Sequence, residues 1–210
     1  MQDWRVLHYE IMKDFLMFLN TKSNRFVLKG GTSLLFCYGL TRFSEDIDLD
    51  GFDDNFFEIV DMFVTDFKNK YLRVTYGVVN NTDTMKSVRI YYGGRKSLKI
   101  DVSYRKKVMD LCEYCNIDGV WTYKVPRILS MKLNVFNHRE RIRDLYDIVF
   151  IYNTYKSRLD SYVLFMLRDA VAYKGLEQFD YLIKDQTDEL IDNSKLAESF
   201  LYMYYDLGLV

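Results

Sequence analysis

Residues 26–50 read FVLKGGTSLLFCYGLTRFSEDIDLD, and two short patterns within them decide which fold we expect. The first is a Gly-Gly-Thr-Ser turn that begins at Gly30, and the second is the Asp-x-Asp of Asp46 and Asp48. A strand sends alternate side chains to one face, so the two aspartates should share a face while Ile47 enters a core. Neighbouring carboxylates repel each other unless a cation neutralises them, and Mg²⁺ prefers carboxylates together with substrate phosphates. The pair therefore predicts a site for a nucleotide and magnesium.

The glycine turn agrees with this prediction. Gly30 and Gly31 lack Cβ atoms, so the backbone can reach positive φ and approach a ligand closely. A helix that opens at Thr32 or Ser33 would direct free N–H groups at a phosphate. Each pattern alone has a simpler interpretation, because a Gly-Gly pair is often only a tight turn and Ser-Glu-Asp-Ile-Asp could be an acidic edge strand. The order strand, turn, helix and Arg-x-Ser-x-Asp-x-Asp is more specific than either pattern.

That order resembles the AbiEii/AbiGii toxin branch of the nucleotidyltransferases, which share the DNA polymerase β-like fold. The similarity is close over residues 29–50, moderate over 124–153 and faint over 85–105. It implies that Asp46 and Asp48 are metal ligands for Mg²⁺, with two ions expected, and that a nucleoside triphosphate is the substrate. The residues expected to bind the nucleotide are Lys29, Gly30, Gly31, Thr32, Ser33, Arg42, Ser44 and Lys132.

The composition is that of an ordinary globular protein. The 210 residues are 49% hydrophobic and 17% aromatic, which is enough to bury a sizeable core in one or two small domains. The start, MQDWRVLHYEIMKDF, is amphipathic and carries acids, so we expect neither a signal peptide nor a membrane span, and a cytoplasmic location.

The three cysteines, Cys37, Cys112 and Cys115, are an odd number without a disulfide pattern, which fits a reducing compartment. Cys112 and Cys115 have metal-ligand spacing. There is no second cysteine pair, however, and His8 and His138 stand apart in the sequence, so structural cysteines are favoured over a zinc site.

Periodicity predicts a sheet half followed directly by a helical half. Expected helices cover residues 4–20 and 32–39, and a third, capped by Asp53-Asp54-Asn55, runs to about residue 69. Expected strands cover residues 24–29, 45–51, 72–79, 86–92 and 97–104, with turns at 80–83 and 93–94. From Pro126 onward the chain should be helical. We therefore expect an α+β, polymerase β-like nucleotidyltransferase core with a mixed sheet in residues 1–122, and a helical bundle in 123–210 that completes the active-site cleft.

The middle of the chain is locally basic although the net charge is only −1. The cations are Lys86, Arg89, Arg95, Lys96, Lys99, Arg105, Lys106 and Lys107, and Tyr91, Tyr92 and Tyr104 lie among them. Such a surface could hold an RNA backbone, with tyrosines available for stacking, or it could simply be a solvated sheet face. Asp101 is the single acid in this stretch, and it alternates with the apolar Ile100 and Val102. It is the candidate for a third metal-binding carboxylate, the alternative being an exposed ion pair.

Lys132 falls in the middle of the apolar arc of the helix expected from Pro126. Burying an unpaired ammonium group costs roughly several kcal/mol of folding free energy. The ammonium of Lys132 should therefore contact a partner of opposite charge or point into an opening of the protein. Its placement is similar to the lysine of the family's helical motif and suggests that it faces the nucleotide. The alternative is a lysine that extends past the apolar side chains to solvent.

Asp144 and Asp147 lie in the first turns of a following helix that is otherwise almost entirely apolar. They are three residues apart, share a side, and stand beside Arg141 and Arg143. Arg-Asp-Leu-Tyr-Asp resembles the family's last motif, which implies acids that face the active cleft. A structural Arg–Asp clamp is the alternative.

These residues combine into an expected reaction in which an acceptor hydroxyl attacks the α-phosphate of the triphosphate. Asp101 or Asp147 could serve a second metal or take the hydroxyl proton. The resemblance implies the 3′ end of a tRNA as acceptor, a growth-inhibiting toxin role and a cognate antitoxin as partner. The rival interpretations are a nucleotidyltransferase for small molecules, such as antibiotics, and a non-catalytic module that binds the nucleotide.

Overall fold

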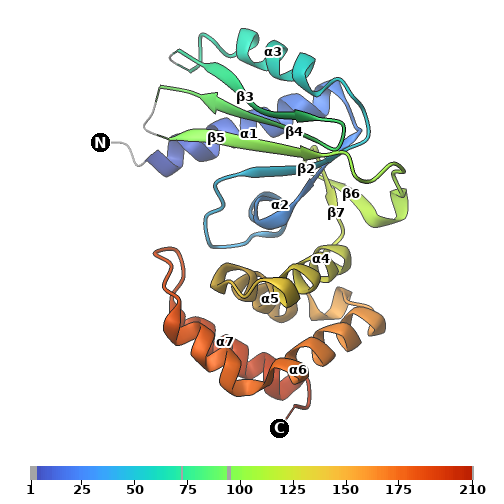
Figure 1. The fold of residues 1–210 in the computed structure, drawn as a ribbon, viewed down its shortest axis with the longest axis vertical. Coiled ribbons are helices and arrows are strands. Elements are labelled where there is room, and N and C mark those ends of the chain that lie inside the picture. Colours follow the sequence, from blue (N-terminus) through green and yellow to red (C-terminus); the bar gives the residue numbers. More distant parts are fainter. Residues whose placement is uncertain (1–3, 72, 94–95, 210) are drawn as a thin grey trace. The chain divides into compact units, whose positions relative to one another are not determined.

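The computed structural model describes residues 4–71, 73–93 and 96–209, and they fall into two compact units. The first unit comprises the chain up to Gly39 and residues Phe43–Tyr123, and the second comprises Leu40–Arg42 and the chain from Lys124 onward. Figure 1 shows a sheet with helices in the first unit and helices alone in the second. The prediction of an α+β fold, with a mixed sheet followed by a helical C-terminal part, is confirmed.

The first unit contains every strand of the described chain. Its helices are α1 (Trp4–Lys22), α2 (Gly30–Tyr38), α3 (Phe56–Asp66) and the short 3₁₀ helix η1 (Leu111–Glu113). Its strands are β1 (Phe26–Lys29), β2 (Ile47–Gly51), β3 (Thr75–Thr82), β4 (Met85–Tyr91), β5 (Ser97–Ser103), β6 (Tyr114–Ile117) and β7 (Val120–Tyr123).

The described strands form one seven-stranded sheet in the order β3-β4-β5-β2-β1-β7-β6. The pairs β2–β5 and β1–β7 are parallel, and the other neighbouring strands are antiparallel. This mixed topology places β2, the strand of the Asp-x-Asp pattern, between β1 and β5.

One face of the sheet carries the core of the first unit. Along β5 the burial alternates, with Ile100 fully buried and its neighbours Lys99 and Asp101 half-buried on the other face. Helices α1 and α3 cover the apolar face, where Phe15 and Phe63 meet edge to face at 5.2 Å between ring centroids. The helices thus leave the carboxylate-bearing side chains of the sheet on the face away from the core.

Several predicted boundaries are wrong for local reasons. Helix α2 begins at Gly30 and not at Thr32, and β2 begins at Ile47 and not at residue 45. Strand β3 continues through the turn predicted at 80–83, after a register shift at Val78/Asn80. The hairpin β6–β7 was not predicted, although its Asp118-Gly119 turn, with φ of 49° and 85°, carries a common hairpin signal. The turn predicted at 93–94 lies partly outside the described residues.

The second unit is a helical bundle. It consists of α4 (Val125–His138), α5 (Ile142–Tyr155), the 3₁₀ helix η2 (Lys156–Arg158), α6 (Ser161–Asp185) and α7 (Asn193–Asp206). Gly175 has non-helical backbone angles and kinks α6. Rings from α4, α6 and α7 form the core, since Phe179 lies 5.9 Å from Phe136 and 4.4 Å from Phe200 between centroids. Within the described part of the chain, no helix has the length and apolar character needed to cross a bilayer.

Candidate active site

The turn between β1 and α2 brings backbone N–H groups next to a carboxylate. Gly30 has a φ of +77°, and a Cβ atom at this position would lie 3.1 Å from Asp48 Oδ2. Glycine is therefore favoured both by the left-handed backbone and by the close approach. No side chain caps α2 at Lys29, and the N-terminus of a helix attracts anions. The contact of this turn with a phosphate stays a prediction.

The hydroxyl groups of Thr32 and Ser33 have different surroundings. Thr32 donates a hydrogen bond to the carbonyl oxygen of Asp46 and lies 2.9 Å from Ser44 Oγ, which ties α2 to the segment that enters β2. Ser33 is completely buried, and its Oγ lies 2.6 Å from Thr122 Oγ1. The Ser33 hydroxyl therefore fixes α2 against β7, and its predicted nucleotide contact is not supported by this placement.

Asp48 and Asp101 are direct neighbours across the parallel strands β2 and β5. Burial raises the pKa of Asp48, and the charges of Asp101 and Asp46 raise it further. Partial loss of solvation raises the pKa of Asp46, which immediately precedes β2, and the charge of Asp101 adds to the rise. Three carboxylates thus act on one another on one face of the sheet, which is the situation that a divalent cation relieves.

Asp101 has an oxygen whose hydrogen-bonding capacity is unused among the described residues. Its Oδ2 accepts a hydrogen bond from Lys99, whereas its buried Oδ1 has no hydrogen-bond partner among the described residues. Hard cations such as Mg²⁺ take carboxylate oxygens, so this donor set fits Mg²⁺. The described residues contain no group of three His, Cys, Asp or Glu side chains already placed to hold a metal ion. The ligand set of Asp46, Asp48 and Asp101 stays a prediction.

Lys29 is engaged within the sheet. Its Nζ lies 2.5 Å from Asp50 Oδ1, and the hydroxyl of Tyr123 donates to the other oxygen of this buried carboxylate. The Lys29 charge also lowers the pKa of Asp48, against the larger effect of burial. Lys29 therefore balances the carboxylates of β2, and its contact with a nucleotide stays a prediction.

The remaining predicted site residues form a cluster in the second unit. Lys132 Nζ lies 2.6 Å from Asp147 Oδ2 and 3.2 Å from Asp144 Oδ1. Arg42 donates two hydrogen bonds to Asp147, at 2.7 and 2.6 Å, and Arg139 Nε lies 3.0 Å from Asp144 Oδ2. We call these five residues the charge cluster. Three cations meet two carboxylates in it, so it keeps one net positive charge.

The charge cluster decides between two alternatives that the sequence left open. Lys132 is buried with 9% exposure and is held by carboxylates, so the interpretation that it extends to solvent is wrong. Asp147 does form an Arg–Asp ion pair, as the second alternative expects. Its partner is Arg42, which is distant in the sequence, and not the nearby Arg143, which pairs with Asp188. Contacts of Arg42, Lys132, Asp144 and Asp147 with a nucleotide stay predictions.

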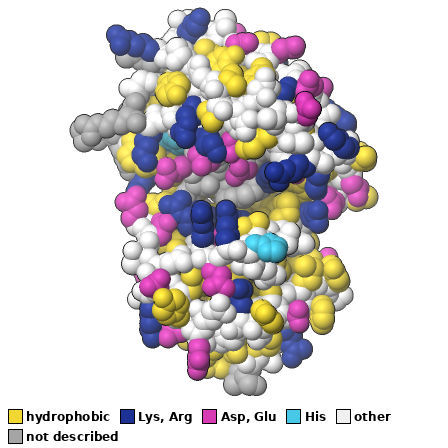
Figure 2. All heavy atoms as spheres, in the orientation of Figure 1, with side chains coloured by type: hydrophobic (Ala, Val, Ile, Leu, Met, Phe, Trp, Pro, Cys, Tyr) yellow, Lys and Arg dark blue, Asp and Glu magenta, His cyan; other side chains and the backbone are white. Residues whose placement is uncertain are grey.

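Four of the eight cations in the basic stretch are paired with neighbouring acids. Lys86 pairs with Asp54, Lys96 with Glu45, Lys99 with Asp101 and Lys106 with Glu113. Figure 2 shows Lys, Arg, Asp and Glu side chains side by side on this face of the first unit. Arg105 and Lys107 are exposed, and Arg95 lies outside the described residues. The predicted RNA surface is thus narrower than the sequence suggests.

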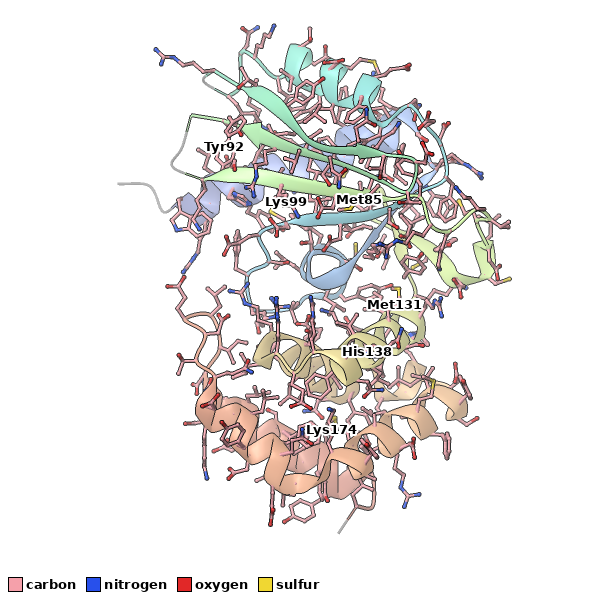
Figure 3. The ribbon with its side chains drawn as sticks, in the orientation of Figure 1. Met85, Tyr92, Lys99, Met131, His138 and Lys174 are labelled. Carbon is pink, nitrogen blue, oxygen red and sulfur yellow. The ribbon has the colours of Figure 1, made fainter. Side chains whose placement is uncertain are left out.

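His8 is a site residue that the sequence did not reveal. It is buried on α1, and its Nε2 donates to the carbonyl oxygen of Glu45, at 2.7 Å, while its Nδ1 lies 2.5 Å from the Tyr92 hydroxyl. This bond fixes the residue that immediately precedes Asp46. Tyr92 directly follows β4 and is labelled in Figure 3. Only the packing of α1 on the sheet brings these residues together, so no local signal could have indicated it.

The cysteines do not form a cluster with other metal ligands in the described residues. All three are free thiols, and Cys115 Sγ lies 3.4 Å from the Tyr38 hydroxyl. Burial raises the pKa of Cys37 to about 12, which makes it an inert core thiol at neutral pH.

A mixed sheet with neighbouring carboxylates beside a glycine turn at a helix N-terminus is the arrangement expected of a nucleotidyltransferase with the polymerase β-like fold. The model of the family described as nucleotidyl transferase AbiEii toxin, type IV toxin–antitoxin system, matches residues 12–200. The chain belongs to this family of nucleotidyltransferase toxins. No curated protein sequence matches it significantly.

Solved structures share the fold. JHP933 from Helicobacter pylori is 24% identical with a TM-score of 0.81, and the alignment covers 99% of this chain and 93% of that one. A second structure from Helicobacter pylori, described as a candidate nucleotidyltransferase, is 25% identical, also with a TM-score of 0.81, over 99% and 96% of the chains. MenT4, a nucleotidyltransferase toxin of Mycobacterium tuberculosis, is 19% identical with a TM-score of 0.50, over 86% and 68%.

Proposed function

We propose that this protein transfers a nucleoside monophosphate from a nucleoside triphosphate to a hydroxyl group of RNA, with the 3′ end of tRNA as acceptor and Mg²⁺ as cofactor. The observation that carries the proposal is the register of β2 and β5, which places Asp48 beside Asp101 and next to the Gly30 turn. Family membership supports the reaction class. The metal is our inference from the carboxylates of the site, and the acceptor is what the family resemblance implies.

In this proposal Asp46, Asp48 and Asp101 hold Mg²⁺, with two ions bound during the reaction. When bound by these carboxylates, Mg²⁺ would supply positive charge to offset the negative charge of the reacting phosphate. The N–H groups at the start of α2 bind and orient a phosphate of the nucleotide, because they lie at the positive end of the helix dipole. Glycine at position 30 lets that phosphate approach the backbone.

The proton of the acceptor hydroxyl needs a base within hydrogen-bond reach. Asp101 keeps one oxygen, itself buried, without a partner among the described residues, whereas both oxygens of Asp147 accept from Arg42 and one of them also pairs with Lys132. We therefore assign the base to Asp101 and treat Asp147 as the counter-ion that positions Arg42 and Lys132. The net positive charge of the charge cluster supports a role of these two cations in attracting the triphosphate.

The family description supports a toxin whose activity is opposed by an antitoxin. We propose that the protein acts on RNA in the cytoplasm and arrests growth by blocking tRNA 3′ ends. Expression in a bacterial host tests this directly, with sequencing of RNA 3′ ends from arrested cells. The proposal predicts extra nucleotides on tRNA from cells that express the wild type, and none with Asp48→Asn. Growth arrest with unchanged RNA ends would point to the rival class, a small-molecule nucleotidyltransferase.

A further inference from the structure

Lys99 has a position that the proposed reaction does not use. It lies on β5, where Figure 3 labels it, two residues before Asp101 and on the same face of the strand. Its ammonium forms an ion pair with Asp101 Oδ2, and both side chains are partly buried, with 30% and 18% exposure. A partly buried ion pair is screened less than a surface one, so this contact has a real electrostatic effect.

The charge of Lys99 reaches all three carboxylates. Its pKa is raised by the hydrogen bond to Asp101, and then by the charges of Asp101, Asp46 and Asp48. In return, Lys99 opposes the rise of the pKa that burial causes in Asp46 and Asp48. The ammonium therefore supplies part of the neutralisation that a divalent cation would supply.

The two carboxylate oxygens of Asp101 have different surroundings. One oxygen is held by Lys99, and the other is buried and has no hydrogen-bond partner in the described part of the chain. On β4, Ser87 lies opposite Asp101 in the antiparallel register, and its buried hydroxyl also has no partner among those residues. Asp101 is thus restrained by Lys99 and by no other described hydrogen bond.

We infer that Lys99 is a built-in competitor for the divalent cation, which holds Asp101 in the metal-free protein and is displaced from it when the metal binds. The inference rests on the proposed metal site at Asp46, Asp48 and Asp101. Both the ammonium and the metal satisfy the same carboxylate charge, so each weakens binding of the other. In the metal-free protein, Lys99 would thereby hold the carboxylate of Asp101 in place. Full occupancy of the site by the metal would require the nucleotide, whose phosphates contribute further ligands.

The test measures divalent binding without nucleotide. Thermal unfolding is followed as Mn²⁺ or Mg²⁺ is titrated into the wild type, Lys99→Gln, Lys99→Arg and Lys96→Gln, since a ligand of the folded state raises its melting temperature. Lys99→Gln should bind the cation about fivefold more tightly, the size expected for loss of a partly exposed ion pair. Lys99→Arg keeps the charge and should behave as the wild type. Lys96→Gln removes an equal charge, paired with Glu45, and should also change nothing.

A second measurement needs no variant. The wild type is acylated briefly with and without Mn²⁺, and the modification of Lys99 and Lys96 is compared by mass spectrometry. Displacement from Asp101 should make Lys99 more reactive when Mn²⁺ is present, with Lys96 unchanged. Equal metal affinity of Lys99→Gln and wild type, or unchanged reactivity of Lys99, overturns the inference while leaving the metal site intact. Absence of any metal effect in both the wild type and Lys99→Gln overturns the proposed metal site and the inference together.

Discussion

At the scale of single residues, Asp48 is central to the candidate site, because it lies beside both Asp101 and the Gly30 turn. The sequence predicted the face of Asp48, because alternation in a strand is a local property. Asp46 lies just before β2, so its pairing with Asp48 stays a prediction. The sequence also predicted the face of Asp101, which the register confirms by placing Asp101 beside Asp48. The partners of charged groups were not predictable. Lys29 binds Asp50, and Lys132 binds Asp147, across separations that only the folded chain brings together.

His8 gives a pH-dependent prediction at the same scale. Burial lowers its pKa, against the raising effects of Glu45 and Asp46, so the folded protein favours the neutral ring. The stabilisation from His8 is therefore complete above its unfolded pKa of about 6.5 and is lost as the pH falls toward the lower folded value.

Denaturant unfolding between about pH 7.5 and 5.5 checks this effect. We expect the free energy of unfolding to fall more steeply for the wild type than for His8→Gln. His138 is exposed, and His138→Gln serves as the matched control with the wild-type slope. Parallel slopes for wild type and His8→Gln would mean that the neutral His8 ring does not stabilise the fold.

At the scale of elements, the turn that opens α2 can be tested through its first glycine. Gly30→Ala combines the strain of a positive φ with a Cβ 3.1 Å from Asp48 Oδ2. Gly39 caps the same helix with a φ of 72°, and a Cβ there meets no atom within 4 Å. Gly39→Ala should cost roughly 1 kcal/mol of folding free energy, from the backbone alone. Gly30→Ala should cost roughly 1 kcal/mol more, since it must also displace Asp48.

Nucleotide binding separates the two variants further. Gly30→Ala should weaken binding of a triphosphate in the presence of Mg²⁺, measured by calorimetry, because both the N–H groups and Asp48 shift. Gly39→Ala should bind as the wild type does. Equal behaviour of the two variants in stability and in binding would show that the turn at Gly30 has no special role.

On helix α4, the structure revises the effect on stability that the sequence predicts for replacing Lys132. From the sequence, Lys132→Met should hardly affect stability, because the methionine packs in the apolar arc. In the structure the change leaves buried Asp144 and Asp147 with fewer counter-charges, so we now expect a loss of roughly 3 kcal/mol in unfolding free energy. Arg139→Gln removes an exposed partner of Asp144 and should cost less than about 1 kcal/mol. A Lys132→Met protein as stable as the wild type would show that the charge cluster does not stabilise the second unit.

At the scale of the whole molecule, the sequence indicated that a sheet half precedes a helical half, but not how the strands pair within the sheet. The change from alternating to helical periodicity gave the sheet half and the helical half. The sheet order depends on pairings such as Leu28 with Thr122, which no local pattern encodes. The same holds for Leu40–Arg42, which belongs to the second unit although it follows α2 directly in the chain.

The RNA surface is a prediction for the first unit as a whole. Since Lys106 is paired with Glu113, the cations left for phosphates after β5 are Arg105 and Lys107. Reversing both to glutamate should weaken RNA binding and flatten its salt dependence, because fewer counterions are released. Lys68 and Lys184 are exposed elsewhere, and their reversal is the matched control. Filter binding at several salt concentrations measures both effects, and an unchanged slope would exclude this patch.

The most direct test of the central claim is nucleotidyl transfer by the purified protein. It is incubated with Mg²⁺, total RNA and each of the four α-labelled triphosphates, beside Asp46→Asn and Asp48→Asn. Both variants should stay folded, with equal or higher melting temperatures in the absence of metal, because each removes a carboxylate from a repelling group. The account predicts label on RNA of tRNA size with the wild type, and none with either variant. Label on RNA at wild-type rates with Asp48→Asn, or no label from any triphosphate with the wild type, would contradict it.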